Sequence, residues 1–366
     1  MDLTEARVLE ILRPVKDPEL NRSMVELGMI KDVRVLSGSA VSLQIELTTP
    51  ACPLKGPIEA SVRDALKAAG VALETLTWGA QVRASPGAKG PMLQQVKNVI
   101  LVGSGKGGVG KSTVAVNLAV ALAKTGAKVG LLDADIYGPS IPLMMGLYGR
   151  KPSSPDGKSI FPLSAYGCEV MSIGFFVDPD QAMIWRGPML HGALVQFFRD
   201  VRWGELDYLV LDLPPGTGDI QLTISQQLKV AGAVIVTTPQ DVALADAIKA
   251  KMMFDKVDIP VLGLVENMSY FACPHCHEKT EIFSRGGGAK AADKLGIPFL
   301  GEVPLHADVR IGGDEGRPIV VTHPESDEAL QLTRIAHVIA DRISVTNIEG
   351  RAAGEKFALP IAAVRS

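Results

Sequence analysis

The sequence predicts an α/β protein in which a small α+β domain precedes a doubly wound, mostly parallel sheet. Short, nearly continuous apolar runs rich in β-branched residues recur along the last three quarters of the chain, as is typical of strands buried on both faces. Stretches of helical periodicity separate these runs, and strand–helix alternation with right-handed crossovers builds an open parallel sheet. A segment rich in proline and glycine sets the first part of the chain apart from this pattern.

Residues 1–83 are expected to form the small domain. Apolar residues at helical spacing open it, and the DPEL sequence at 17–20 predicts a turn after a short helix. The expected elements are, in order, a helix over 3–12, strands over 33–35 and 41–47, a helix over 57–69 and a strand over 76–82.

Residues 84–97 are the expected linker, because proline, glycine and small residues concentrate there. The large domain is expected over 98–345, with a flexible tail over 346–366. Its apolar runs predict strands over 98–103, 128–133, 208–214, 231–239, 261–268 and 298–304. Its helices are expected over 112–124, 187–200, 241–256, 286–295 and about 326–343.

The composition excludes several classes of protein. Hydrophobic residues make up 47% and charged residues 21% of the 366 residues, which argues against disorder. Lys and Arg total 37 against 40 Asp and Glu, so we expect no nucleic-acid partner. The longest apolar run, over 114–123, is too short to span a bilayer, and the first twenty residues resemble neither a signal nor a transit peptide. We therefore expect a cytoplasmic protein with no membrane partner.

A glycine-rich loop follows the first predicted strand of the large domain. Residues 105–112 read G-x-x-x-x-G-K-S between a strand and a helix, which predicts a phosphate-binding loop and a sheet of the P-loop NTPase type. Lys111 is expected to reach the β- and γ-phosphates of ATP, and the Ser112 hydroxyl to coordinate Mg²⁺. The expected nucleotide-binding residues of the loop are Gly105, Lys106, Gly107, Gly108, Val109, Gly110, Lys111, Ser112 and Thr113.

The second lysine of the loop, Lys106, carries a resemblance. The sequence K-G-G-V-G-K-S is similar to the deviant Walker A ATPases, the family of MinD and ParA. In that family the extra lysine contacts the nucleotide of a facing subunit, so the resemblance implies a homodimer. A cation added to the charge developing on the γ-phosphate lowers the barrier to hydrolysis. Lys106 and Lys111 are therefore expected to be catalytic.

Acidic residues follow two of the predicted strands, where the carboxyl ends of parallel strands carry ligand chemistry. The resemblance implies that Asp135 orients or activates the attacking water. Asp133 is either structural or an outer contact of Mg²⁺, and Asp212 occupies the position of a Walker B aspartate that acts on the Mg²⁺ shell. Gly216 or Thr217, in the PPGTGD sequence, is expected to sense the γ-phosphate.

Two further positions match those that contact adenine in relatives. They are Asn267 and the stretch 301–305.

Cys273 and Cys276 form a Cys-x-x-Cys pair directly after the strand predicted over 261–268. Zinc or a cubane cluster usually needs four ligands, so this pair is incomplete by itself. Either His275 and His277 join it within one chain, or two chains each supply two thiolates across a symmetry axis. The dimer implied by Lys106 favours the second arrangement. Four thiolates suit either Zn²⁺ or a [4Fe–4S] cluster.

Several motifs together closely resemble the Mrp/ApbC branch of this family, over about residues 96–345. They are GKGGVGKST, DADIYGPS, WRGPM (185–189), DLPPGTGD and ENMSYFACPHC. The resemblance implies that the cysteine pairs of two subunits bridge a labile [4Fe–4S] cluster, which is handed to apo-proteins with the help of ATP. The sequences at 17–20, 25–33 and 48–55 resemble the small domain of iron–sulfur assembly factors.

Three residues within these small-domain motifs are of interest in themselves. Cys52 is expected at a strand–helix junction, where a helix N-terminus lowers a thiol pKa and favours a transient ligand, although a merely buried thiol fits as well. Asp17 and Glu19 are more simply turn-capping than functional. A fourth, Cys168, is assigned to the core.

The leading hypothesis is a homodimeric ATPase that carries a [4Fe–4S] cluster, with cluster-assembly scaffolds and apo iron–sulfur proteins as its partners. The alternative is a MinD/ParA-like positioning or regulatory ATPase with structural zinc at the cysteine pair. Against membrane positioning, the C-terminal sequence EKFALPIAAVRS contains Pro360 and no basic amphipathic helix.

Overall fold

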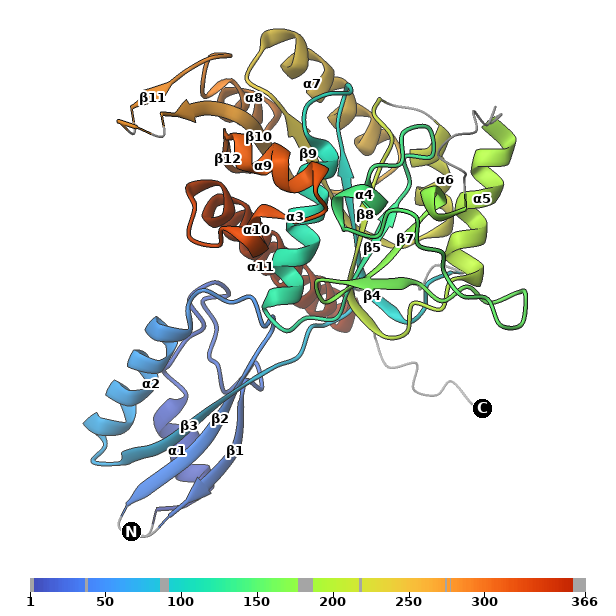
Figure 1. Cartoon of the computed structure of the whole chain (residues 1–366). Coiled ribbons are helices and arrows are strands. Elements are labelled where there is room, and N and C mark those ends of the chain that lie inside the picture. The colour runs from blue at the N-terminus through green and yellow to red at the C-terminus, as the bar shows by residue number, and fades with distance from the viewer. Residues whose placement is uncertain are drawn as a thin grey trace. The chain divides into compact units, whose positions relative to one another are not determined.

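The computed structural model describes residues 3–36, 39–85, 92–176, 187–216, 219–273, 275–276 and 278–357. The chain divides into two compact units, each with its own sheet (Figure 1). The small unit comprises Met1–Arg83 and Ala340–Ser366, and the large unit comprises Ala84–Ile339. In the described part of the chain, no helix combines the length and the hydropathy needed to cross a membrane.

The large unit is built on a mostly parallel sheet, which confirms the predicted fold class. Among the described residues its strands are β4 (Val96–Gly103), β5 (Val129–Asp133), β6 (Leu163–Ala165), β7 (Cys168–Ser172), β8 (Leu206–Asp212), β9 (Val230–Thr237), β10 (Val261–Ala272), β11 (Lys279–Thr280) and β12 (Phe299–Leu305). Their order is β11-β10-β9-β4-β8-β5-β7-β6, and β12 also pairs with β10. Only the pairs β6–β7 and β10–β11 among these are antiparallel.

Helices cover both faces of this sheet (Figure 1). They are α3 (Lys111–Lys124), α4 (Ile141–Met144), α5 (Gly187–Asp200), α6 (Asp219–Gln227), α7 (Asp241–Lys256), α8 (Gly287–Leu295), α9 (Ala307–Asp314), α10 (Ile319–Thr322) and α11 (Asp327–Phe357), with a 3-10 turn at Ile173–Phe175. Helix α3 packs against β4, β5 and β8. It is apolar on nearly every side because it is covered by α10 as well as by the sheet.

The register of the central strands brings their polar ends together. Val102 of β4 lies opposite Asp212 of β8, and Asp133 of β5 lies opposite the same Asp212. These three strands are neighbours in space although long segments of chain separate them. Polar residues from three sequence motifs therefore meet at one edge of the sheet.

The small unit is an α+β fold around a three-stranded sheet. Its elements are α1 (Glu5–Leu12), β1 (Ile30–Val35), β2 (Ala40–Leu47), α2 (Lys55–Ala68) and β3 (Ala72–Ala80). Strand β2 is central, antiparallel to β1 and parallel to β3. Every second residue of β2 is buried, so one face of the sheet forms the core with α1 and α2.

The last helix differs from the sequence prediction. Helix α11 continues to Phe357, beyond the end expected at about residue 343. Ile348 is 5% exposed within the core of the small unit, and the Asn347 Nδ2 donates to the Arg83 carbonyl over 2.9 Å. These contacts join residues far apart in sequence, so local periodicity did not predict them.

The same helix contributes to a cluster of acidic residues. The Asp17 Oδ1 accepts from the backbone N–H groups of Glu19 and Leu20, over 3.0 and 2.9 Å, as expected of a turn cap. The Asp341 carboxyl of α11 donates to Glu19, and its Oδ1 is buried with no partner among the described residues. Burial, followed by the charges of Glu19 and Asp17, raises the pKa of Asp341 to about 8. Burial and the charge of Asp17 also raise the pKa of Glu19.

Cys52 lies beside these carboxylates. Burial raises the pKa of its thiol to about 11, and the negative charges of Asp341, Glu19 and Asp17 add to this effect. The expected lowering of this pKa by a helix N-terminus is therefore wrong. The backbone hydrogen bond at Leu54 favours the Cys52 thiolate, but burial and the nearby negative charges raise the pKa by more than this bond lowers it.

The Asp341 carboxyl makes the stability of the protein fall with rising pH. Its pKa is about 8 in the folded protein and about 3.9 in an unfolded chain, so the folded state holds the extra proton between these values. The free energy of unfolding should fall as the pH rises from about 4 to about 8. We expect Asp341→Asn to reduce this fall, measured by urea unfolding between pH 5 and pH 8.5, by about 1 kcal/mol or more.

Asp64→Asn is the matched control, because it removes an exposed carboxylate from the same unit. It should leave the pH dependence of stability as it is in the wild type. An unchanged profile in Asp341→Asn would show that this carboxyl is charged at neutral pH.

Candidate nucleotide site and cysteine pair

The glycine-rich loop joins the end of β4 to the start of α3, and its glycines are required by the backbone. Gly108 and Gly110 have φ values of +77° and +79°, in the left-handed region that favours glycine. A Cβ placed on Gly105 would come within 2.1 Å of the Asp246 carbonyl oxygen in α7. Because Gly110 caps α3, the N-terminal amides and the positive end of that helix face the loop. This is a site suited to an anion.

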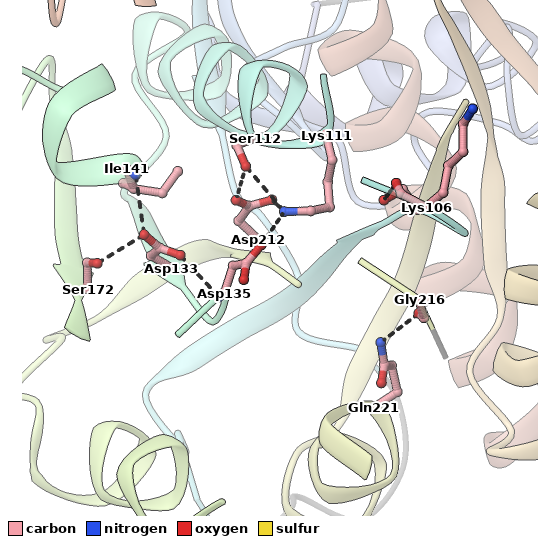
Figure 2. A network of polar contacts seen from close by, with 11 residues as sticks. Lys106, Lys111, Ser112, Asp133, Asp135, Ile141, Ser172, Asp212, Gly216 and Gln221 are labelled. Carbon is pink, nitrogen blue, oxygen red and sulfur yellow. Dashed lines mark hydrogen bonds and ion pairs between the residues drawn. The ribbon is translucent and has the colours of Figure 1, made fainter. Parts of the chain in front are cut away.

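Lys111 and Ser112 converge on a buried carboxylate at the ends of the strands (Figure 2). The Lys111 Nζ lies 2.5 Å from the Asp212 Oδ1, and the Ser112 Oγ donates to the Asp212 Oδ2 over 2.5 Å. The Asp135 Oδ2 lies 3.9 Å from the same Nζ. Lys111 is 7% exposed and Asp212 is fully buried, so the ion pair is well shielded from water. The structure thus brings together residues from three separate motifs.

The charges at this edge oppose one another. Burial raises the pKa of Asp212, and the ammonium group of Lys111 opposes this effect. Burial likewise raises the pKa of Asp135, with Lys111 as the main opposing influence. The Ser112 hydroxyl and the carboxylates are oxygen donors of the kind that Mg²⁺ prefers, so this set of side chains fits a magnesium nucleotide.

Asp133 holds the loop that follows β5. One of its oxygens accepts from the Asp135 N–H over 3.1 Å, and the other from the Ile141 N–H and the Ser172 Oγ over 3.3 and 3.0 Å (Figure 2). Burial, followed by the charge of Asp212, raises its pKa well above the usual range. These contacts favour the structural interpretation of Asp133 over an outer contact of Mg²⁺.

Lys106 is placed differently from Lys111. Its side chain points away from the contact between Lys111 and Asp212 (Figure 2). In the second predicted switch, the Gly216 N–H donates to the Ser104 carbonyl, and the Gly216 carbonyl accepts from Gln221. Thr217 lies outside the described residues.

A cavity of about 310 Å³ lies next to the loop, within the large unit. Asn267 borders it, and the Asn267 Nδ2 donates to the Val109 carbonyl of the loop over 2.9 Å. The other lining residues are Thr113, Ser140, Leu143, Met144, Met268, Pro304, Leu305, His306, Val309, Arg310, Gly313 and Asp314. The structure therefore places Thr113, Asn267 and the end of the stretch 301–305 around one cavity. The contributions of α4 and α9 were missed, because nothing local in their sequences points to a ligand.

The cysteine pair begins directly after β10, which ends at Ala272. The Cys273 N–H donates to the Glu278 carbonyl over 3.0 Å, which closes the turn. The backbone N–H groups of Cys276 and His275 donate to the Cys273 thiol and lower its pKa. Cys276 is exposed and Cys273 is half-buried. The turn is therefore shaped to favour a thiolate at the surface.

Within the described part of the chain, no three His, Cys, Asp or Glu side chains are grouped so as to hold a metal ion. His275 is not grouped with the two cysteines in such a set. His277 lies outside the described residues. At this turn, the described residues supply two thiols, those of Cys273 and Cys276.

Cys168 lies in β7 and is fully buried, as expected of a core residue.

Comparisons with known proteins agree with this arrangement. Residues 95–340 match the model of the NUBPL iron-transfer P-loop NTPases, and residues 5–72 match that of the iron-sulfur cluster assembly proteins. The iron-sulfur cluster carrier protein of Synechocystis is 52% identical over 356 residues, which cover 94% of this chain and 99% of that protein. The iron-sulfur cluster transfer protein NUBPL of Dictyostelium discoideum is 52% identical over 256 residues, which cover 70% of this chain and 79% of that protein.

A solved structure adds a nucleotide-bound relative. The nucleotide-binding protein of Archaeoglobus fulgidus, in complex with ADP, is 44% identical and superposes with a TM-score of 0.56. The match covers 64% of this chain and 92% of that protein. The resemblance inferred from the motifs is confirmed, and this chain belongs to the iron-transfer P-loop NTPase family, with an iron-sulfur cluster assembly domain at its N-terminus.

Proposed function

We propose that this protein binds and hydrolyses ATP with Mg²⁺, and that two copies of it carry a labile [4Fe–4S] cluster between their cysteine pairs. The cluster is cargo, received from assembly scaffolds and delivered to apo iron–sulfur proteins in the cytoplasm. The observation that carries the proposal is the turn at Cys273 and Cys276, which favours a thiolate but supplies only half of a four-thiolate site. Membership of a cluster-transfer family supports iron–sulfur cargo over structural zinc.

The nucleotide half of the proposal assigns one task to each charged group. Lys111 neutralises the β- and γ-phosphates, and Ser112 together with Asp212 holds the Mg²⁺ shell. Asp135, which lies 3.9 Å from Lys111 at the same edge, orients the attacking water. Lys106 completes the site of the facing subunit, which its direction away from Lys111 supports (Figure 2).

The cluster half depends on symmetry. A two-fold axis near the cysteine turns places four thiolates around one centre, whereas one chain offers two. An exposed position for Cys276 allows a second chain, and later an apo-protein, to reach the cluster. Ligand exchange from one pair of thiolates to another is then the transfer step.

Iron binding tests the cluster half. Anaerobic reconstitution with iron and sulfide should give about four irons per dimer and a broad absorbance near about 400 nm. Cys273→Ala and Cys276→Ala should each lose the iron, and Cys168→Ala, which removes a core thiol, should keep it. Zinc in the purified protein with no uptake of iron would refute the carrier proposal and restore the structural-zinc alternative.

Two lysine variants test the nucleotide half. Lys111→Ala should weaken ATP binding by a factor of about 100, because it removes the buried cation from the phosphates. Lys106→Ala should bind ATP within about threefold of the wild type but hydrolyse it about 10³-fold more slowly, because its charge acts in the transition state. Calorimetry and steady-state hydrolysis measure the two effects.

The exposed Lys290→Ala is the control and should change neither quantity. Normal hydrolysis by Lys106→Ala would contradict a role for this lysine in the facing site.

A further inference from the structure

Strand β10 contacts the glycine-rich loop through Asn267 and carries the cysteine turn six residues later. The Asn267 Nδ2 donates to the Val109 carbonyl over 2.9 Å. A Cβ placed on Gly110 would come within 2.1 Å of the same Nδ2, so the Asn267 side chain lies directly against the loop. The Asn267 side chain is therefore a group of β10 that meets the loop directly when the loop shifts on taking up phosphates.

The strand changes its course directly after this contact. Met268 has a φ of +56°, a left-handed value that is strained for a residue with a long side chain. The pairing of β10 with β12 steps from Asn267 opposite Val303 to Phe271 opposite Leu305, so four steps on β10 match two on β12. This is a bulge, and bulges redirect the side chains that follow them.

Within the bulge, the Ser269 hydroxyl lies within hydrogen-bond distance of two carboxylates. The Ser269 Oγ lies 2.5 Å from the Glu266 Oε1 and 3.0 Å from the Glu302 Oε2. A hydroxyl has a single proton, so Ser269 can donate to only one of them at a time. Glu266 is buried and also accepts from the Gly286 N–H, whereas Glu302 is held by Arg285. The Ser269 proton therefore has two candidate acceptors at the bulge.

The ring of Tyr270 connects the bulge to the cysteine turn. The Lys279 Nζ lies 4.4 Å and the Arg285 Cζ 4.6 Å from the ring centroid, both within the range of cation–π attraction. Tyr270 is 4% exposed. Lys279 belongs to β11, which pairs with Phe271 and Ala272 and closes the hairpin that holds the cysteines.

We infer that the bulge of β10 couples the nucleotide site to the cysteine pair, and that Tyr270 is the residue that positions the cysteine hairpin in response to the loop. Displacement of Asn267 shifts the hydrogen bond of Ser269, and the Tyr270 ring moves the β11 side of the hairpin with it. The identity of the cargo rests on the proposed function, but the coupling itself is a property of the metal-free chain. Nucleotide binding should therefore change the reactivity of the two thiols.

The test uses the full chain, reduced and free of metal. Alkylation rates of Cys273 and Cys276 with iodoacetamide are measured by mass spectrometry, with and without Mg²⁺ and a non-hydrolysable ATP analogue. We expect the nucleotide to change at least one rate about threefold or more in the wild type and in Tyr270→Phe, which keeps the ring. In Tyr270→Leu the ratio of rates with and without nucleotide should fall to about one, while nucleotide affinity stays within about threefold.

Tyr148→Leu, at an exposed tyrosine, is the matched control and should behave as the wild type. If Tyr270→Leu does not fold, Lys279→Gln is used instead. It removes one of the two cations on the ring and should reduce the effect of nucleotide on the alkylation rate by about half. A merely structural role for Tyr270 would raise both rates together and leave the ratio unchanged, and this result would overturn the inference. The inference would also be overturned if the ratio of rates in Tyr270→Leu stayed as in the wild type because nucleotide-driven dimerisation protects the thiols.

Failure of this test and failure of the proposed function are distinguishable. A wild-type ratio of one, together with about four irons per reconstituted dimer, would remove the coupling and leave the carrier. A nucleotide-dependent ratio of alkylation rates without iron uptake would support the coupling and refute the proposed cluster cargo.

Discussion

The buried ion pair between Lys111 and Asp212 is the constraint on which the large unit depends. A fully buried carboxylate is costly unless a cation and further donors satisfy it. Here Lys111 and Ser112 do so from the first turn of α3, across a sheet edge to which β4, β5 and β8 all contribute. The pair depends on β4 and β8 being neighbours in this register, because Lys111 follows β4 and Asp212 ends β8. A replacement that removed Lys111 alone would leave two adjacent carboxylates, Asp212 and Asp135, without their main cation.

The same requirement explains the packing around the glycine-rich loop. Helix α3 must begin close to the end of β4 for Lys111 to reach Asp212. The loop between them therefore has little room for side chains. Gly105 lies against the backbone of α7, and Gly110 lies against Asn267 of β10. The loop is thus in contact with a helix, α7, on one side and with strand β10 on the other. Because β10 continues directly to the cysteine pair, the strand that contacts the anion site also leads to the cysteine turn.

Two cysteines of this chain illustrate how surroundings determine thiol chemistry. At Cys273, backbone N–H groups of the following turn stabilise the thiolate and lower its pKa. At Cys52, burial and three nearby carboxyl groups raise the pKa to about 11, so the thiol stays protonated at neutral pH. Cys273 is therefore suited to hold a soft metal, whereas a proton must leave Cys52 before it can do so. Both cysteines follow strands in neighbourhoods rich in proline or aromatic residues, and their sequences alone do not separate them.

The sequence by itself determined the class of fold, most strands of the large unit to within a few residues and the elements of the nucleotide site. Apolar runs such as 98–103 and the spacing from Gly105 to Ser112 are local patterns, and local patterns follow from backbone sterics and burial on both faces. The tertiary structure alone decided what depends on long-range contacts. It placed Asp133 in a structural role through Ile141 and Ser172, extended α11 by burying Ile348 in the small unit, and surrounded Cys52 with carboxyl groups. The bulge at Met268 and the ring contacts of Tyr270 belong to the same class, because their partners on β11 and β12 come later in the chain. The physical reason is that burial and charge are sums over neighbours in space, which a single sequence does not list.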